Sequence, residues 1–166
     1  MTGSNPTDRS KLGTKGHILT DKNGIPLSVV ISSANSHDIK LVTDVMDNVV
    51  VKRSSSSTKC NSSRKRKLQH LCLDKAYNSK TVKQAIIKRG YVLHIPYKSN
   101  RGEKIKSICQ KKYPTAKNKR WVVERTNSWH NRFRKLYTRY EKKAENYLGL
   151  VQFSCCIIIY KKIILG

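Results

Sequence analysis

LQHLCLDKAYNSKTVKQAIIKRGYVLHIP, residues 68–96, is the stretch that decides the fold. The short apolar run at residues 68–73 predicts a strand, and residues 91–96 predict a second one. Between them, Ser79 is placed to cap a helix and Gly90 to end it. Strand, helix and strand within about thirty residues indicate a βαβ unit with parallel strands. The fold class is therefore α/β.

Asp74 directly follows the first strand of this unit. In parallel sheets, ligands and catalytic groups gather at the carboxyl ends of the strands, and Asp74 occupies such an end. The alternative is an ordinary turn residue. The position of Asp74 leaves both interpretations open.

The chain before this unit is predicted to hold a β-hairpin. Residues 16–31 contain two apolar runs around Asn23-Gly24, a pair that favours a tight two-residue turn. Pro26 removes a backbone donor near the start of the second strand, which fits an edge position. Residues 1–15 show no strand or helix period.

Three other segments complete the outline. Apolar residues recur at helical spacing over residues 41–49, where Ser36 or Asp38 can cap a helix. Residues 53–67 are basic and serine-rich, which predicts a flexible loop within a single partial domain of residues 1–166.

Two helices are predicted after residue 119. Residues 120–140 carry an apolar set at helical spacing, and residues 143–163 predict a final, buried helix. The predicted core stripe of the first of these helices is Val122, Trp129, Phe133, Leu136 and Tyr140.

The net charge of +25, from 35 basic and 10 acidic residues, predicts a polyanionic partner such as nucleic acid. A ribosomal-type or membrane-surface protein would be equally basic. The polar first fifteen residues argue against a signal peptide, and the last apolar run is interrupted by Lys161-Lys162. We therefore expect a cytoplasmic, nucleoid-associated protein that is neither secreted nor membrane-bound. The five cysteines have no C-x-x-C spacing, which indicates reduced thiols.

Glu124 is the second carboxylate of interest. It points away from the predicted apolar stripe and shares a helix face with Arg120 at i−4, Ser128 and Asn131. A surface ion pair worth at most about 0.5 kcal/mol is the alternative. Because acidic residues are scarce, two carboxylates near a basic groove suggest Mg²⁺ ligands. Two such ions can activate a water or a 3′-hydroxyl and stabilise the leaving oxygen of a phosphodiester.

Three blocks of the chain together resemble a known family. They are NPTDRSKLGTKGHILTDKNGIPLSVVISSANSHD (5–38), LDKAYNS (73–79) and RWVVERTNSWHNRFRKL (120–136). In order and spacing they are similar to the catalytic domain of bacterial insertion-sequence transposases of the DDE superfamily. The resemblance implies a ribonuclease H-like mixed sheet flanked by helices, with two aspartates and one glutamate that bind two divalent metals. It assigns the second aspartate to Asp74 and the glutamate to Glu124, as catalytic residues and metal ligands.

The sequence departs from the family pattern in three places. Ala76 stands where many relatives have Gly, and Asn131 stands where a basic residue is common. The family's first aspartate lies in a strand before the first block, but residues 1–10 contain no strand-like run, and Asp8 matches a non-catalytic position. We therefore expect the first, central strand and its aspartate to be missing. A two-ion Mg²⁺ (or Mn²⁺) site is expected only with that aspartate, so this chain alone should be weakly active or inactive.

The resemblance also suggests DNA contacts and supporting residues. Basic side chains are candidate phosphate contacts as a group, although each is individually compatible with simple solvation: Lys11, Lys15, Arg120, Arg125, Arg132 and Arg134. The supporting candidates are Tyr77, Trp121, His37 and Asp38. His37 and Asp38 are equally compatible with helix capping. For Trp121, core packing is favoured over stacking on a distorted base.

The implied function is that of a transposase, an enzyme of mobile elements that cleaves and transfers DNA strands during transposition. Its partners would be double-stranded DNA, namely the terminal inverted repeats and the target, within an oligomeric synaptic complex. Some relatives are encoded in two frames, so this chain would be a C-terminal part with an upstream-frame fragment as partner. The alternatives are an inactive remnant or a non-enzymatic nucleic-acid-binding protein.

Overall fold

The computed structural model describes residues 2–5, 9–51, 68–96 and 121–165. The chain divides into two compact units, the first formed by residues 1–50 and 119–166 and the second by residues 51–118. Both contain strands and helices, which confirms a mixed α/β architecture. The predicted loop at 53–67 and Arg120 lie outside the described residues, and the single domain stays a prediction.

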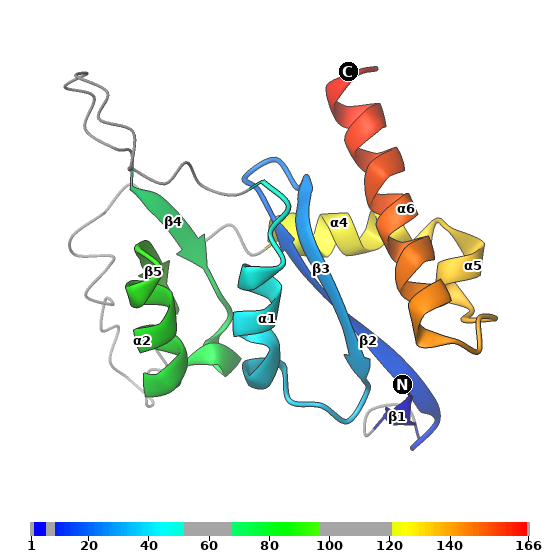
Figure 1. Cartoon of the computed structure of the whole chain (residues 1–166), viewed down its shortest axis with the longest axis horizontal. Coiled ribbons are helices and arrows are strands. Elements are labelled where there is room, and N and C mark those ends of the chain that lie inside the picture. The colour runs from blue at the N-terminus through cyan, green and yellow to red at the C-terminus, as the bar shows by residue number, and fades with distance from the viewer. Residues whose placement is uncertain (1, 6–8, 52–67, 97–120, 166) are drawn as a thin grey trace. The chain divides into compact units, whose positions relative to one another are not determined.

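The second unit is the predicted βαβ unit. It runs β4 (Gln69–Cys72), the 3₁₀ turn η2 (Lys75–Tyr77), α2 (Lys80–Lys88) and β5 (Tyr91–His94). The two strands pair in parallel, from Gln69 opposite Tyr91 to Cys72 opposite His94 (Figure 1). Both strands are shorter than predicted, although the Leu73 N–H still donates to the His94 carbonyl at 2.9 Å.

Apolar side chains hold α2 in the second unit. Ile86 is completely buried and Val82 nearly so, as are Leu71 of β4 and Leu93 of β5. Gly90 has a φ of 75°, which is the left-handed conformation expected of a residue that ends a helix. The buried side chains of α2 and of the two strands together form the core of the second unit, at the edge of which β4 ends.

The start of α2 differs from the prediction in one detail. Ser79 is the N-cap residue, but its side chain makes no capping hydrogen bond. The hydroxyl is instead 2.6 Å from the hydroxyl of Thr81. The position of the cap was therefore predicted, and its side-chain interaction was not.

The first unit contains an antiparallel sheet in the order β1 (Gly3–Ser4), β2 (Leu12–Thr20) and β3 (Pro26–Ser33). The prediction that residues 1–15 hold no strand is wrong, because β2 begins at Leu12. The ladder accounts for this, since Gly3 pairs with Gly13 and Thr14 pairs with Ser33. The edge position of β3 in the described sheet agrees with the prediction from Pro26.

The hairpin joins β2 to β3 through residues 21–25, so the predicted two-residue turn is wrong. Gly24 alone in this loop has a positive φ, at 86°. The Asp21 carboxylate accepts hydrogen bonds from the backbone N–H groups of Asn23 and Ile25, both at 2.8 Å. The Asp21 side chain therefore organises a wider loop than an Asn-Gly turn alone would give.

Helices pack on both faces of the hairpin (Figure 1). The 3₁₀ turn η1 (Asp38–Leu41) and α1 (Val42–Asp47) lie on one side, where the Ser28 hydroxyl donates to the Val45 carbonyl at 2.6 Å. The last helix, α6 (Ala144–Ile163), lies on the other side against β3. Neither predicted cap is used, because His37 is the N-cap residue of η1 and makes no side-chain capping bond.

The helix predicted over residues 120–140 is broken into α4 (Trp121–Asn131) and α5 (Arg134–Tyr137). Phe133 is extended, and its N–H donates three residues back to the His130 carbonyl, which closes the end of α4. No proline or glycine lies in this stretch to signal the break. Of the predicted stripe, only Val122 is confirmed as buried, because the other buried side chains of α4 are Thr126 and His130. Tyr140 is 75% exposed.

α6 occupies the predicted position but is buried along only one face. Val151, Ser154, Cys155 and Ile158 point inward, whereas Phe153 is 64% exposed. The prediction of a wholly buried helix is therefore wrong for its outer face. In the residues that the structure describes, no helix is both long and apolar enough to cross a membrane.

Candidate active site

Asp74 lies where β4 ends, half-buried, and serves as the N-cap residue of η2. One carboxylate oxygen accepts a hydrogen bond from the Lys75 N–H at 2.7 Å, and the Asp74 carbonyl accepts one from the Tyr77 N–H at 3.1 Å. The two interpretations of Asp74 are thus compatible. It follows a parallel strand and also holds the turn that leads into α2.

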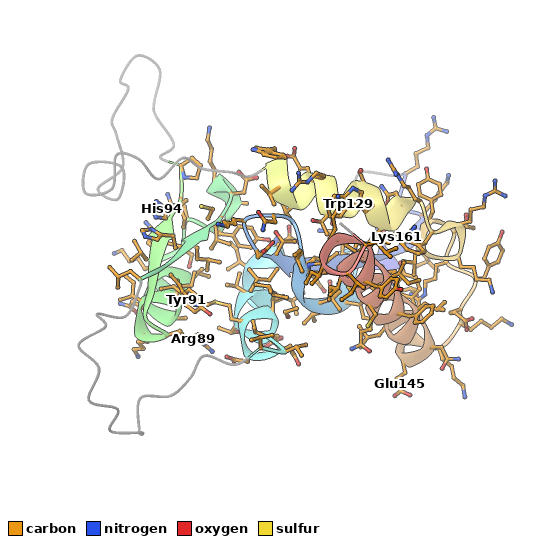
Figure 2. All side chains as sticks on the ribbon, turned by 90° about the horizontal axis from the view of Figure 1, so that it is seen from above. Arg89, Tyr91, His94, Trp129, Glu145 and Lys161 are labelled. Atoms are coloured by element: carbon orange, nitrogen blue, oxygen red, sulfur yellow. The ribbon has the colours of Figure 1, made fainter. Side chains whose placement is uncertain are left out.

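Two histidines lie beside this strand end. Strand alternation places His70, Cys72 and His94 on one face of the two-stranded sheet and the buried leucines on the other. His70 Nδ1 is 2.7 Å from His94 Nε2, and His94, labelled in Figure 2, is buried. Burial lowers the pKa of His94, and the neighbouring His70 lowers it further. The pair therefore favours the neutral form of His94.

Glu124 is exposed in the first turn of α4. Ser128 and Asn131, on the same side of the helix, are exposed too, and the buried residues occupy the opposite side. The prediction that Glu124 points away from the core is confirmed. A carboxylate in the first turn is also favoured by the helix dipole.

Two residues next to Glu124 attach α4 to the hairpin loop. The Thr126 hydroxyl donates to the Gly24 carbonyl at 2.7 Å, and the Arg125 guanidinium donates to the Asn23 carbonyl at 2.5 Å. A Cβ on Gly24 would lie 3.0 Å from the Thr126 hydroxyl and 3.1 Å from the Arg125 Nη2. Glycine is therefore favoured by the close packing as well as by its positive φ, and this packing helps to position Glu124.

Arg125 is also enclosed by aromatic rings. Its guanidinium carbon lies 4.8 Å from the centre of the Trp121 ring and 5.2 Å from that of Trp129. The Lys162 ammonium of α6 lies 5.0 Å from the Trp129 ring, which Figure 2 labels. The guanidinium is thus committed to contacts within the fold, and its predicted DNA contact stays a prediction. The core packing predicted for Trp121 is wrong, because the ring stacks on Arg125 and is 54% exposed.

A buried hydrogen-bonded pair joins α4 to α6. His130 Nδ1 is 2.7 Å from the Ser154 hydroxyl, which itself donates to the Val151 carbonyl. Burial lowers the pKa of His130. Burial also raises the pKa of the Cys155 thiol, 3.8 Å from His130 Nε2, to about 11. A thiol with that pKa stays protonated near neutral pH.

The other predicted site residues are distributed over the first unit. The Lys15 ammonium lies 3.3 Å from the Asp38 carboxylate and donates to the Ser36 carbonyl at 3.4 Å. Asp38 is thus held by an ion pair and caps no helix. Exposed side chains include three of the candidate DNA contacts and His37: Lys11, Arg132, Arg134 and His37.

Asp74 belongs to the second unit and Glu124 to the first, so their meeting at one metal site stays a prediction. Within the described ranges, no group of three or more His, Cys, Asp and Glu side chains could hold a metal ion. Each carboxylate nevertheless has a defined backbone setting, at a strand end and on an anchored helix.

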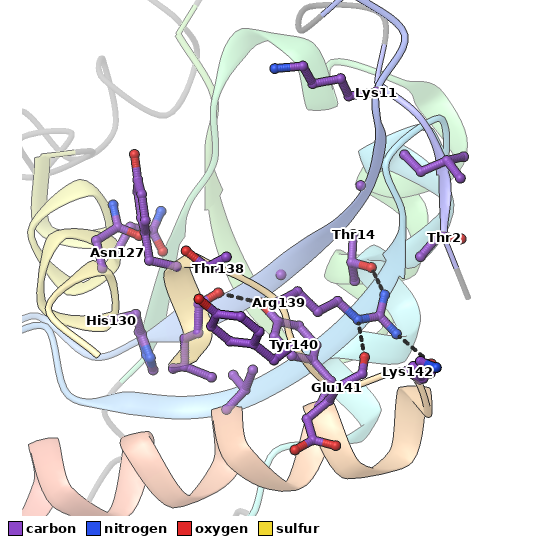
Figure 3. Close-up of a pocket in the computed structure, with 18 of the residues that line it drawn as sticks. Thr2, Lys11, Thr14, Asn127, His130, Thr138, Arg139, Tyr140, Glu141 and Lys142 are labelled. Carbon is purple, nitrogen blue, oxygen red and sulfur yellow. Dashed lines mark hydrogen bonds between the residues drawn. The ribbon is translucent and has the colours of Figure 1, made fainter. Parts of the chain in front are cut away.

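The first unit also contains a groove of about 1040 Å³ (Figure 3). It is lined by the face of β2 that carries Thr14, by α4, and by the segment from α5 to the start of α6. Of the predicted DNA-binding residues, only Lys11 lines it. The tyrosines of the groove were not predicted as site residues, although RKLYTRYEKK at residues 134–143 interleaves aromatic and basic residues.

Comparison with known proteins gives a consistent result. Residues 2–159 match the model of a family described as the transposase DDE domain. A protein described as a transposase for insertion sequence element IS402, from Burkholderia cepacia, is 30% identical over 160 residues. That similarity covers 96% of this chain and 68% of the relative. No solved structure matches the chain.

Proposed function

Because this chain belongs to the DDE transposase family, we propose that it supplies two carboxylates of a metal-dependent site that cleaves and transfers DNA strands at insertion-sequence ends. Asp74 and Glu124 are these carboxylates. The proposed fold around them is ribonuclease H-like.

The observation that carries the proposal is the setting of Asp74. Asp74 follows the end of β4, which pairs in parallel with β5. The helix α2 connects these two strands. In α/β sheets, this is the position from which side chains reach a substrate. Support for Glu124 comes from its exposed position on α4, which Thr126 and Arg125 anchor to the hairpin loop.

The two carboxylates are the kind of ligand that a hard divalent cation prefers, but two of them do not complete a two-ion site. Carboxylate oxygens are the ligands that Mg²⁺ and Mn²⁺ prefer. Two carboxylates alone are too few for a two-ion site. When bound, such ions activate an attacking hydroxyl and stabilise the leaving oxygen of the phosphodiester. The role of Asp74 and Glu124 is to hold the ions.

The basic residues supply attraction to DNA. With a net charge of +25, the chain binds phosphates and releases counterions, so affinity falls as salt rises. Double-stranded DNA, as inverted repeat or target, is the proposed partner, in an oligomeric synaptic complex with an upstream-frame fragment. Exposed cations are the candidate phosphate contacts, foremost Lys11, Arg132 and Arg134.

The proposal is tested by metal titration. Isothermal titration with Mn²⁺ should detect weak binding by the wild-type chain, and Asp74→Asn and Glu124→Gln should each reduce it. Glu145→Gln is the matched control, because it removes an exposed carboxylate in the first turn of α6, outside the proposed site. Equal titration curves for the wild type and all three variants would favour a non-enzymatic nucleic-acid-binding protein.

Catalysis provides the second test. The 166-residue chain alone should not cleave a duplex carrying its insertion-sequence end in Mg²⁺, because Asp74 and Glu124 supply two carboxylates and a two-ion site of this family uses three. Cleavage by this chain, abolished by Asp74→Ala, would show that the two carboxylates suffice and that the expected inactivity is wrong.

A further inference from the structure

The groove in the first unit has a rigid wall. Its loop at residues 138–142 is held by Arg139, which donates to the Glu141 carbonyl at 3.0 Å, to the Lys142 carbonyl at 3.4 Å and to the Thr14 hydroxyl (Figure 3). The same guanidinium lies 5.0 Å from the centre of the Tyr147 ring on α6. The loop is thus tied to β2 and to α6, and the groove exists before any ligand binds.

The lining of the groove is suited to an anionic chain. Lys11, Arg139 and Lys142 contribute three positive charges, and Glu141 contributes one negative charge. Asn127 and Asn131 of α4 add amide groups that can donate hydrogen bonds, and both are exposed. Cations and amides such as these, which line the groove from several elements, are groups that contact phosphates.

Two tyrosines add a second kind of contact. Tyr137 is 76% exposed and Tyr140 is 75% exposed, and both line the groove. They are three residues apart and flank Arg139, which the fold already uses. Exposed aromatic rings in a basic groove are the means by which proteins stack unpaired bases.

We propose that this groove binds a single strand of DNA, with its phosphates on Lys11 and Lys142 and its bases on Tyr137 and Tyr140. A duplex does not present base faces to aromatic side chains, so the rings favour an unpaired strand over paired DNA. An acidic protein segment would satisfy the cations but leave both rings without a stacking partner. This inference rests on the proposed function, because strand cleavage and transfer expose unpaired ends near the protein.

The test compares single-stranded and duplex binding by fluorescence anisotropy. The probes are a labelled oligothymidine of about ten nucleotides, within the usual size of such sites, and a duplex of random sequence. Tyr137→Ala combined with Tyr140→Ala should weaken oligothymidine binding by roughly tenfold or more and change duplex binding less than about twofold. Lys11→Gln combined with Lys142→Gln should lower the slope of log affinity against log salt by about 1.4 for the oligothymidine.

Matched controls come from outside the groove. Tyr160→Ala on α6 and Lys40→Gln on η1 also remove an exposed ring and an exposed cation, and neither should discriminate between the two probes. Circular dichroism melting checks that each variant folds. The inference would be overturned if groove and control variants lost equal affinity for oligothymidine. It would also be overturned if the groove variants lost equal affinity for oligothymidine and for the duplex.

Two outcomes separate this inference from the proposed function. If duplex binding persists and the groove variants behave as wild type with oligothymidine, the groove assignment fails while the transposase proposal stands. If the wild type binds neither probe, both fail. Displacement of the oligothymidine by a polyglutamate peptide of equal length at equal or lower concentration would assign the groove to an acidic protein partner and overturn the inference.

Discussion

Gly24 shows how a single residue positions a candidate catalytic side chain. Its φ of 86° favours glycine, and two side chains of α4 leave little room for a Cβ. The carbonyl of Gly24 accepts the hydroxyl of Thr126, two residues after Glu124. The orientation of α4, and with it Glu124, therefore depends on the backbone of a loop about a hundred residues earlier in the sequence.

Gly24→Ala should lower the free energy of unfolding by about 1–3 kcal/mol, because the new Cβ is strained in this conformation and close to Thr126 and Arg125. Gly16→Ala is the matched control, since a Cβ there meets nothing within 4 Å. Urea denaturation measures both. Similar losses for the two variants would contradict the role assigned to Gly24.

Thr126→Val should cost about 1–3 kcal/mol of stability, because it leaves the buried Gly24 carbonyl without its donor while keeping the side-chain shape. Thr126→Ser keeps the hydroxyl and should retain more of that hydrogen-bond energy. Urea unfolding of the two variants measures the difference. The interpretation fails if serine proves as destabilising as valine.

His130 predicts a pH dependence of stability. Burial holds its folded pKa below the unfolded value of about 6.5. The unfolded chain therefore takes up a proton before the folded chain does. The contribution of His130 is complete above pH 6.5 and is lost as pH falls toward the folded pKa, by at most about 1.4 kcal/mol per pH unit.

His130→Gln should therefore flatten the loss of stability between neutral and mildly acidic pH, whatever its effect at neutral pH. Urea denaturation at a series of pH values gives the slope for each protein. An unchanged slope in the variant would show that His130 does not contribute to the acid sensitivity.

At the scale of elements, the sequence predicted those parts of the fold that depend on local patterns. The apolar runs and Gly90 sufficed for the βαβ unit, and two apolar runs around Asn23-Gly24 sufficed for the hairpin. The buried face of α4 was missed because Thr126 and His130 are polar residues that become buriable only through Gly24 and Ser154. Apolar periodicity carries no information about such distant partners.

The candidate site also contains residues that local sequence patterns predicted and residues that they did not. Asp74 could be placed from sequence because a strand end is a local feature. Its association with Glu124 was predicted only through the family resemblance and stays a prediction, because Asp74 and Glu124 belong to different units. The groove tyrosines were missed because the helix was predicted to continue through residue 140, whereas the extended Phe133 ends α4 and redirects Tyr137 and Tyr140.

The two faces of α6 should respond differently to substitution. Ile158→Ala removes a side chain that is 5% exposed and should cost about 2–4 kcal/mol of stability. Phe153→Ala removes a larger side chain that is 64% exposed and should change stability by only about 0.5 kcal/mol. Thermal or urea unfolding distinguishes them. A large loss for Phe153→Ala would mean that its ring is covered in solution.

At the scale of the whole molecule, the net positive charge is the main feature that bears on DNA binding. A net charge of +25 would attract DNA, the proposed partner, whereas the carboxylates Asp74 and Glu124 would repel it. Metal ions would convert that repulsion into attraction. Neutralising the carboxylates should therefore raise the affinity for DNA without divalent ions and lower it when such ions are present.

Asp74→Asn combined with Glu124→Gln removes two negative charges and raises the net charge from +25 to +27. Without divalent ions, the variant should bind duplex DNA as tightly as the wild type or a few-fold more tightly. With Mn²⁺, the wild type should gain affinity relative to the variant. Anisotropy titrations in both buffers measure this. If Mn²⁺ changes both affinities by the same factor, the carboxylates do not mediate metal-dependent DNA binding.

The stacked arrangement around Arg125 has an optical consequence. Trp121 and Trp129 are the only two tryptophans of the chain, and both lie on α4. The second unit contains none, so tryptophan emission reports the first unit alone. Both rings lie against the guanidinium next to Glu124, so their spectrum is sensitive to any shift of this helix. The protein thus has an intrinsic fluorophore beside a proposed metal ligand, and DNA or metal binding there can be followed without a label.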